Sequence, residues 1–267
     1  MNLRVSVLTL LLAAMLAGCV VPKGQVPAAN ESKDRITASD ESDGSKRARV
    51  RLELATAYFS RGQMTTALDQ VKLAISADPN LGEAFNLRGL IYASLGDNRV
   101  AEESFRRALQ INALDADTMQ NYGWYLCQQK RYGEANTLFQ RALTVPQYRD
   151  SPRTLLTQGV CQAFAGDVLT AERTLSRSYE LDPANPSTAV NLSELLYRRG
   201  DLERARFYIR RVNSIPEVAS AQTLWLAARI ENKLGNAPEA QSLGDQLRKR
   251  FPDSRESSAF DRGLFDE

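Results

Sequence analysis

The sequence predicts an all-α fold in which six helix pairs stack into a superhelical solenoid. Three observations predict it: small residues recur every 34 to 36 positions, alanines recur in step with them, and a turn separates each small residue from its alanine. Alanine and leucine are also frequent in amphipathic stretches, and this composition favours helix over sheet. A repeating pair that cannot bury its own apolar face must stack on its neighbours.

The two parallel series define the helix crossings. The small residues are Ala55, Gly89, Gly123, Gly159, Ser193 and Ala228, and the alanines are Ala67, Ala101, Ala135, Ala171, Ala205 and Ala240. Small residues let antiparallel helices approach closely, so we expect Gly89 to lie against Ala101, with the same arrangement at Gly123 and Gly159. A third series places an apolar residue four positions after each alanine, and Gly244 breaks it.

The turn within each pair carries helix stop and start signals. Glycine precedes a polar residue at Gly62-Gln63, Gly96-Asp97, Gly166-Asp167, Gly200-Asp201 and Gly235-Asn236. Glycine ends a helix readily in the left-handed conformation, and Asp or Asn can cap the next helix. The third pair has Lys130-Arg131 instead.

These residues resemble the tetratricopeptide (TPR) family, which implies a right-handed superhelical solenoid of six TPR helix pairs with a concave groove. The expected repeats span 48–81, 82–115, 116–151, 152–185, 186–220 and 221–254. The remaining residues 255–267 are expected to form a tail or a short capping helix.

Residues 1–18 are predicted to be a cleaved export signal. Arg4 supplies the basic start, and residues 5–16 are mostly apolar but too few for a good membrane span. The run ends in Leu16-Ala17-Gly18-Cys19, which resembles the bacterial lipobox. The resemblance implies lipidation of Cys19, and Val20 in place of Asp implies transport to the periplasmic face of the outer membrane. The alternative is an ordinary signal peptide with a chance cysteine.

Residues 19–47 are predicted to be the lipidated N-terminus and a flexible tether. The stretch is polar, includes Pro22 and Pro27, and has too little apolar content to offset the entropy of ordering.

Composition argues against an enzyme. The chain has no histidine, which excludes His-dependent nucleophilic catalysis and His-ligated metal sites. We find no nucleotide-binding loop and no metal-ligand spacing, and the only cofactor-like group expected is the lipid on Cys19. The net charge of +2 gives no footprint for nucleic acid, and no small-molecule substrate is indicated. The run around Glu102, Glu103, Arg106 and Arg107 is interpreted as a solvated helix face.

Cys127 and Cys161 lie 34 residues apart, each near the end of a first helix. Adjacent first helices pack with their axes about 8–10 Å apart, so side chains in the seam can meet the spacing of a disulfide. The predicted periplasmic location favours oxidation. We therefore predict a Cys127–Cys161 disulfide, with two buried thiols as the alternative.

The third repeat narrows the family. Residues 121–135 read NYGWYLCQQKRYGEA, and this run, after a lipobox and a polar tether, resembles the type IV pilus biogenesis lipoproteins PilF and PilW. The resemblance implies that the protein binds the pilus secretin and promotes its localisation or multimerisation, as a pilotin, or stabilises pili. The alternative is an adaptor for outer-membrane protein assembly or for peptidoglycan hydrolases.

The first helices are expected to line the concave groove where a partner binds. By spacing, the predicted groove residues are Leu52, Thr56, Phe59, Asn86, Leu90, Gln120, Trp124 and Leu156. Trp124 is the strongest single candidate because aromatic side chains make good interface anchors. The alternative is that Trp124 only packs between helices.

Overall fold

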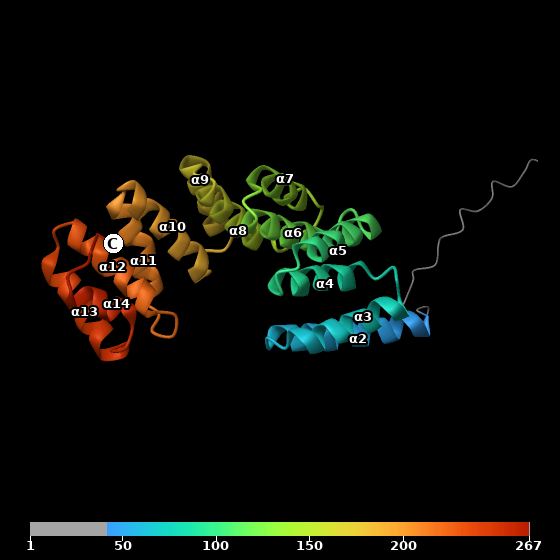
Figure 1. The fold of residues 1–267 in the computed structure, drawn as a ribbon. Helices are drawn as coiled ribbons and strands as arrows, with labels where there is room; N and C mark the ends of the chain where they lie inside the picture. Colours follow the sequence, from blue (N-terminus) through green and yellow to red (C-terminus); the bar gives the residue numbers. More distant parts are fainter. Residues whose placement is uncertain (1–41, 267) are drawn as a thin grey trace, which may run out of the picture. The chain divides into compact units, whose positions relative to one another are not determined.

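The computed structural model describes residues 42–266, and its first helix begins at Asp43 (Figure 1). The predicted signal peptide, Cys19 and the predicted tether up to residue 41 lie outside the described residues. No helix in the described part of the chain is long and apolar enough to cross a membrane.

Residues 42–266 contain thirteen helices and no strand, which confirms the predicted all-α class. The helices are α2 (Asp43–Ser60), α3 (Met64–Ala77), α4 (Gly82–Ser94), α5 (Asn98–Ile111), α6 (Ala116–Gln128), α7 (Tyr132–Leu143), α8 (Ser151–Phe164), α9 (Val168–Leu181), α10 (Pro186–Arg199), α11 (Leu202–Asn213), α12 (Ala221–Lys233), α13 (Ala237–Arg250) and α14 (Arg255–Asp261). The first twelve pack mainly as six consecutive pairs, α2 with α3 through α12 with α13.

The ends of the repeat region differ from the sequence-based boundaries. Helix α2 begins at Asp43, so residues 43–47 belong to the first helix and the predicted extension of the tether to residue 47 is wrong. At the other end, residues 255–261 form the short helix α14, which packs on α12 and α13.

The turns use the predicted residues only in part. The side chains of Asp97 and Asp167 accept hydrogen bonds from Val100 N and Thr170 N, as expected for helix caps. Asp201 caps nothing, because its carboxylate binds arginine side chains instead. In the third repeat Lys130 takes the left-handed conformation at φ 61°, which for a residue with a Cβ costs about 1–2 kcal/mol.

At two helix crossings, the glycine of the first helix faces a large side chain of the second helix. A Cβ atom placed on Gly89 would lie 2.7 Å from the ring of Phe105, and one on Gly123 would lie 2.8 Å from Phe139. The nearest side chain is therefore not the predicted alanine but the large residue four positions after it. Because glycine has no side chain, a fully buried ring from the second helix fits against the backbone of the first.

The last pair explains why Gly244 breaks the third series. A Cβ on Gly244 would lie 2.0 Å from the ring of Phe260, which α14 inserts at this point. Gly244 thus leaves a hollow in α13, and Phe260, 7% exposed, fills it. The end of the solenoid is closed by an aromatic side chain from outside the repeats.

Candidate partner-binding groove

A hollow of about 370 Å³ lies on the first helices of the third, fourth and fifth repeats. It is lined by Gln120, Trp124, Arg153, Leu156, Thr157, Val160 and Asn191. Three of the predicted groove residues, Gln120, Trp124 and Leu156, meet here. The surface that α6, α8 and α10 form around this hollow is called the groove below.

A mainly apolar surface between α8 and α10 extends the groove. A second hollow of about 120 Å³ shares Val160 and Asn191 with the first and adds apolar residues of α8, α9 and α10 and a charged rim; the added residues are Ala163, Phe164, Leu175, Leu195, Glu194 and Arg198. The rings of Trp124 and Phe164 lie 6.5 Å apart between centroids, and Phe164 is 62% exposed. An exposed aromatic next to a half-buried tryptophan is typical of an interface anchor.

Polar groups fix one wall of the hollow. Arg153 on α8 donates a hydrogen bond from Nε to Gln120 Oε1 on α6 at 3.1 Å, and it lies 3.9 Å from Asp117. Gln120 is buried, so this contact also satisfies its carbonyl. The guanidinium therefore spans the boundary between the third and fourth repeats, beside the apolar floor.

The other five predicted groove residues do not line this hollow. Leu52 and Phe59 are partly buried against the core of the first repeats, and Leu90 packs against the next core. The hydroxyl of Thr56 donates to the carbonyl of Leu52 in its own helix at 2.9 Å. Asn86 Oδ1 accepts from Asn121 Nδ2 at 3.3 Å, so it bridges two repeats.

The sequence reasoning missed Val160, Phe164 and Asn191. The sequence does contain a signal for Val160, since this residue follows Gly159 directly, as Trp124 follows Gly123. Choosing the residue after the small residue in every repeat would have identified Val160. Phe164 lies one turn further along the same helix face.

A disulfide joins the helices under the groove. Cys127 on α6 and Cys161 on α8 are bonded, with their Cα atoms 5.8 Å apart, and each is 2% exposed. The bond spans the irregular connection after α7, where Gln147 takes a left-handed φ of 61°. It therefore ties together the two helices that carry Trp124 and Leu156.

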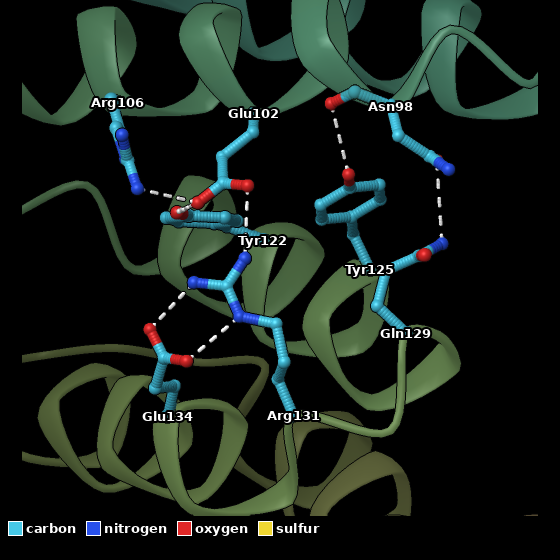
Figure 2. A network of polar contacts seen from close by, with 8 residues as sticks. All are labelled: Asn98, Glu102, Arg106, Tyr122, Tyr125, Gln129, Arg131 and Glu134. Carbon is cyan, nitrogen blue, oxygen red and sulfur yellow. Dashed lines mark hydrogen bonds and ion pairs between the residues drawn. The ribbon is translucent and has the colours of Figure 1, made fainter.

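A polar network crosses the seam between the second and third repeats (Figure 2). Glu102 on α5 accepts hydrogen bonds from Tyr122 Oη at 2.9 Å and from Arg131 Nη1 at 2.9 Å, and it pairs with Arg106 at 2.6 Å. Arg131 also holds Glu134 through two bonds. The interpretation of Glu102 as part of a solvated face is therefore wrong: its side chain is only 20% exposed.

The network sets the charge of its members. Burial raises the pKa of Glu102, but hydrogen bonds from Arg131 and Tyr122 and the positive charge of Arg106 outweigh it, so that pKa lies below its usual value. The pKa of Arg131 is raised by its bonds to Glu134 and Glu102. Both groups stay charged at neutral pH, and the seam is held as an ion pair.

We expect Glu102→Gln to lower the free energy of unfolding by about 1 kcal/mol at pH 7, since it removes a charge-assisted pair that is partly screened by solvent. A carboxylate with a depressed folded-state pKa stabilises above its unfolded-state pKa, and that contribution is lost as the pH falls through the folded-state pKa. The difference from wild type should therefore shrink below about pH 4.5. Urea unfolding at pH 7 and pH 3.5 measures it.

The neighbouring Glu103 is the matched control for this prediction. Its side chain is 61% exposed and, within the described part of the chain, pairs only with the exposed Arg99 at 3.4 Å. Glu103→Gln should change stability by less than about 0.5 kcal/mol at either pH. Equal losses for both variants would contradict the assigned role of Glu102.

Other seams use the same position with different chemistry. Glu172, which like Glu102 directly follows the alanine of its helix, pairs with Arg199 and with Arg204. Asn136 accepts instead from Gln158 at 2.8 Å and Gln162 at 3.1 Å in the next repeat. Each of these seams is thus joined by its own polar pairing.

Comparison with known proteins identifies relatives that share this repeat fold. Residues 86–152 match the tetratricopeptide repeat family model. The solved structure of PilW, described as a widely conserved type IV pilus biogenesis factor, is 33% identical, with a TM-score of 0.74 over 80% of this chain and 97% of that chain. The chain belongs to the PilF and PilW family.

A second relative agrees along almost the whole chain. The type IV pilus assembly protein PilF of Pseudomonas aeruginosa is 28% identical over 256 residues, which cover 95% of this chain and 96% of the relative. A solved structure of Pseudomonas aeruginosa PilF has a TM-score of 0.71 over 83% of this chain at 24% identity, which supports the fold. Membership in the PilF and PilW family confirms the resemblance seen in residues 121–135 and places the protein in type IV pilus biogenesis.

Proposed function

We propose that this protein is an outer-membrane lipoprotein scaffold that binds the type IV pilus secretin through its groove. Binding promotes localisation or multimerisation of the secretin, or stabilises assembled pili. The observation that carries the proposal is the apolar hollow in which Trp124, Leu156 and Val160 meet beside the exposed Phe164. A hollow of this kind, with polar groups at one wall, suits an extended or helical segment of another protein.

The mode of action we propose is binding rather than catalysis. Helices α6 and α8 are joined by a disulfide, so the groove is pre-organised and less entropy is lost when a partner binds. The lipid on Cys19 and the tether are part of the same proposal: they hold the solenoid at the periplasmic face of the outer membrane, where secretin subunits arrive. A random coil as long as the predicted tether, residues 19–47, has an end-to-end distance of about 30 Å.

Truncating the groove aromatics is expected to weaken secretin binding. Trp124→Ala and Phe164→Ala each remove an anchor, and hot-spot aromatics contribute about 2 kcal/mol or more, so affinity should fall at least tenfold. The measurement is co-purification of the secretin from detergent-solubilised outer membranes, quantified by blotting with an antibody against the secretin.

Phe207→Ala is the matched control, because Phe207 is 55% exposed but lies on the second helix α11. It should bind the secretin as wild type does. Unchanged binding by Trp124→Ala and Phe164→Ala, with unchanged thermal unfolding, would exclude the groove as the binding surface. A deletion strain with normal secretin multimers and normal surface pili would contradict the proposed function itself.

A further inference from the structure

The residues after α14 form a short tail that lies on the first helices of the last two repeats. The ring of Phe265 lies 5.2 Å from that of Trp225 on α12, between centroids. The carbonyl of Phe265 accepts hydrogen bonds from Arg229 Nε at 3.1 Å and from Tyr197 Oη at 3.4 Å. Asp266 pairs with Lys233 at 3.8 Å. An aromatic ring, a main-chain carbonyl and a carboxylate are each recognised.

The tail occupies positions that correspond to the groove. Trp225 and Arg229 stand three residues before and one residue after the small residue of α12. Gln120 and Trp124 hold the same two positions in α6, where they line the hollow of about 370 Å³. The tail is therefore a segment of protein already bound to the first-helix face, at the end of the solenoid.

The floor of this site is aromatic and positively charged. The guanidinium of Arg229 lies 4.6 Å from the centre of the Tyr197 ring, and Lys233 Nζ lies 4.7 Å from the same centre. Two cations stacked on one ring attract a carboxylate that follows an aromatic residue. A segment that fits this site therefore carries an acidic residue directly after an aromatic one.

The tail and helix α14 share one aromatic cluster but differ in their main contacts. The ring of Phe260 fills the hollow over Gly244 and lies 5.5 Å from Phe265 and 6.3 Å from Trp225, whereas Phe265 lies 5.2 Å from Trp225, all between ring centroids. Gly263, with φ 67°, turns the chain between them. Phe265 is half-buried and Asp266 is 91% exposed, so the tail can leave its site while α14 stays docked.

We propose that the face formed by α10 and α12, at Tyr197, Trp225, Arg229 and Lys233, is a docking site for a partner segment in which an aromatic residue precedes an acidic one. Residues 264–266 hold this site until such a segment displaces them. The inference goes beyond the proposed function, and its test uses no pilus component.

The tail competes for this site with the advantage of being attached to it. A tethered segment acts at an effective concentration of about the millimolar range, so a free segment of equal affinity must exceed that level to displace it. Disabling the tail should therefore lower the apparent dissociation constant of a free segment by at least tenfold.

Nuclear magnetic resonance tests this directly, because the chain has two tryptophans and hence two indole N–H signals. The full ¹⁵N-labelled chain is titrated with the acetylated and amidated peptide of residues 262–266, as wild type and as Phe265→Ala. A Trp124→Phe chain assigns the two signals. We expect the peptide to shift the Trp225 signal of Phe265→Ala towards its wild-type position, whereas the same concentrations leave the Trp225 signal of wild type, whose site the tail already fills, unmoved. The Trp124 signal should stay unmoved in both.

Three controls make the outcome decisive. The peptide with alanine in place of phenylalanine should leave the Trp225 signal unmoved, and Arg229→Gln added to Phe265→Ala should weaken binding because the carbonyl loses the guanidinium, one of its two donors. Far-ultraviolet circular dichroism checks that Phe265→Ala keeps α14 folded. A Trp225 signal of Phe265→Ala that does not move at several times the millimolar effective concentration overturns the proposal. A wild-type dimer that Phe265→Ala converts to monomer also overturns it, since the occupant would then be the tail of a second copy.

Discussion

Replacing both Cys127 and Cys161 by alanine should lower the free energy of unfolding by about 4 kcal/mol, since the disulfide closes a loop over a sequence separation of 34 residues. The bond restricts the unfolded chain, and it links two repeats whose connection is irregular. In a solenoid each repeat is stabilised mainly by its neighbours, so a weaker junction lets the halves unfold separately. We expect a broader transition in urea, with an intermediate that wild type lacks.

Dithiothreitol provides the control. Reduced wild-type protein should unfold as the double variant does, whereas the double variant itself should not respond to the reductant. Binding of the secretin should weaken in parallel, because α6 and α8 carry the groove. A wild-type protein whose unfolding is unaffected by full reduction would show that the bond contributes nothing to stability.

Gly244→Ala should lower the free energy of unfolding by about 2 kcal/mol, the contribution expected from burying one phenylalanine side chain. The added methyl group would lie 2.0 to 2.5 Å from three atoms of the Phe260 ring, so the ring cannot stay where it is. Helix α14 must therefore undock. Hydrogen exchange of residues 255–261 should rise to the rate of unstructured peptide.

Gly133→Ala is the matched control because the same substitution on α7 meets no atom within 4 Å. It should leave stability unchanged or raise it slightly, as alanine is the better helix former. Loss of stability in both variants would mean that the helix, rather than the contact with Phe260, is sensitive. Retained protection of residues 255–261 in Gly244→Ala would exclude the assigned anchor.

The number and pairing of the helices could be predicted because they depend on local, repeated features. Every pair carries its small residue, alanine and turn at nearly the same spacing, so the pattern survives substitutions such as Lys130-Arg131. The start of α2 could not be predicted, because residues 43–47 are polar and are helical only as an extension of the first repeat.

The candidate site was predictable only in part. Spacing indicates which side of a helix faces the groove, but whether that side forms a hollow depends on the sizes of neighbouring side chains from other repeats. Leu90 and Trp124 hold the same position in their helices, yet Trp124 lines the hollow described above, whereas Leu90 packs against a core. The role of Glu102 was missed because a charged run gives no sign of which member meets the next repeat.

The seam pairings restrict how this solenoid can change in evolution. Repeat proteins commonly gain and lose units by duplication and deletion, which succeeds when every junction is alike. Here Glu102 requires Arg131, Asn136 requires two glutamines, and Glu172 requires two arginines. Excising one unit would join surfaces that do not match and leave polar groups without their partners. We therefore expect the order of the repeats to be constrained, with insertions and deletions of units better tolerated at the two ends than between these seams.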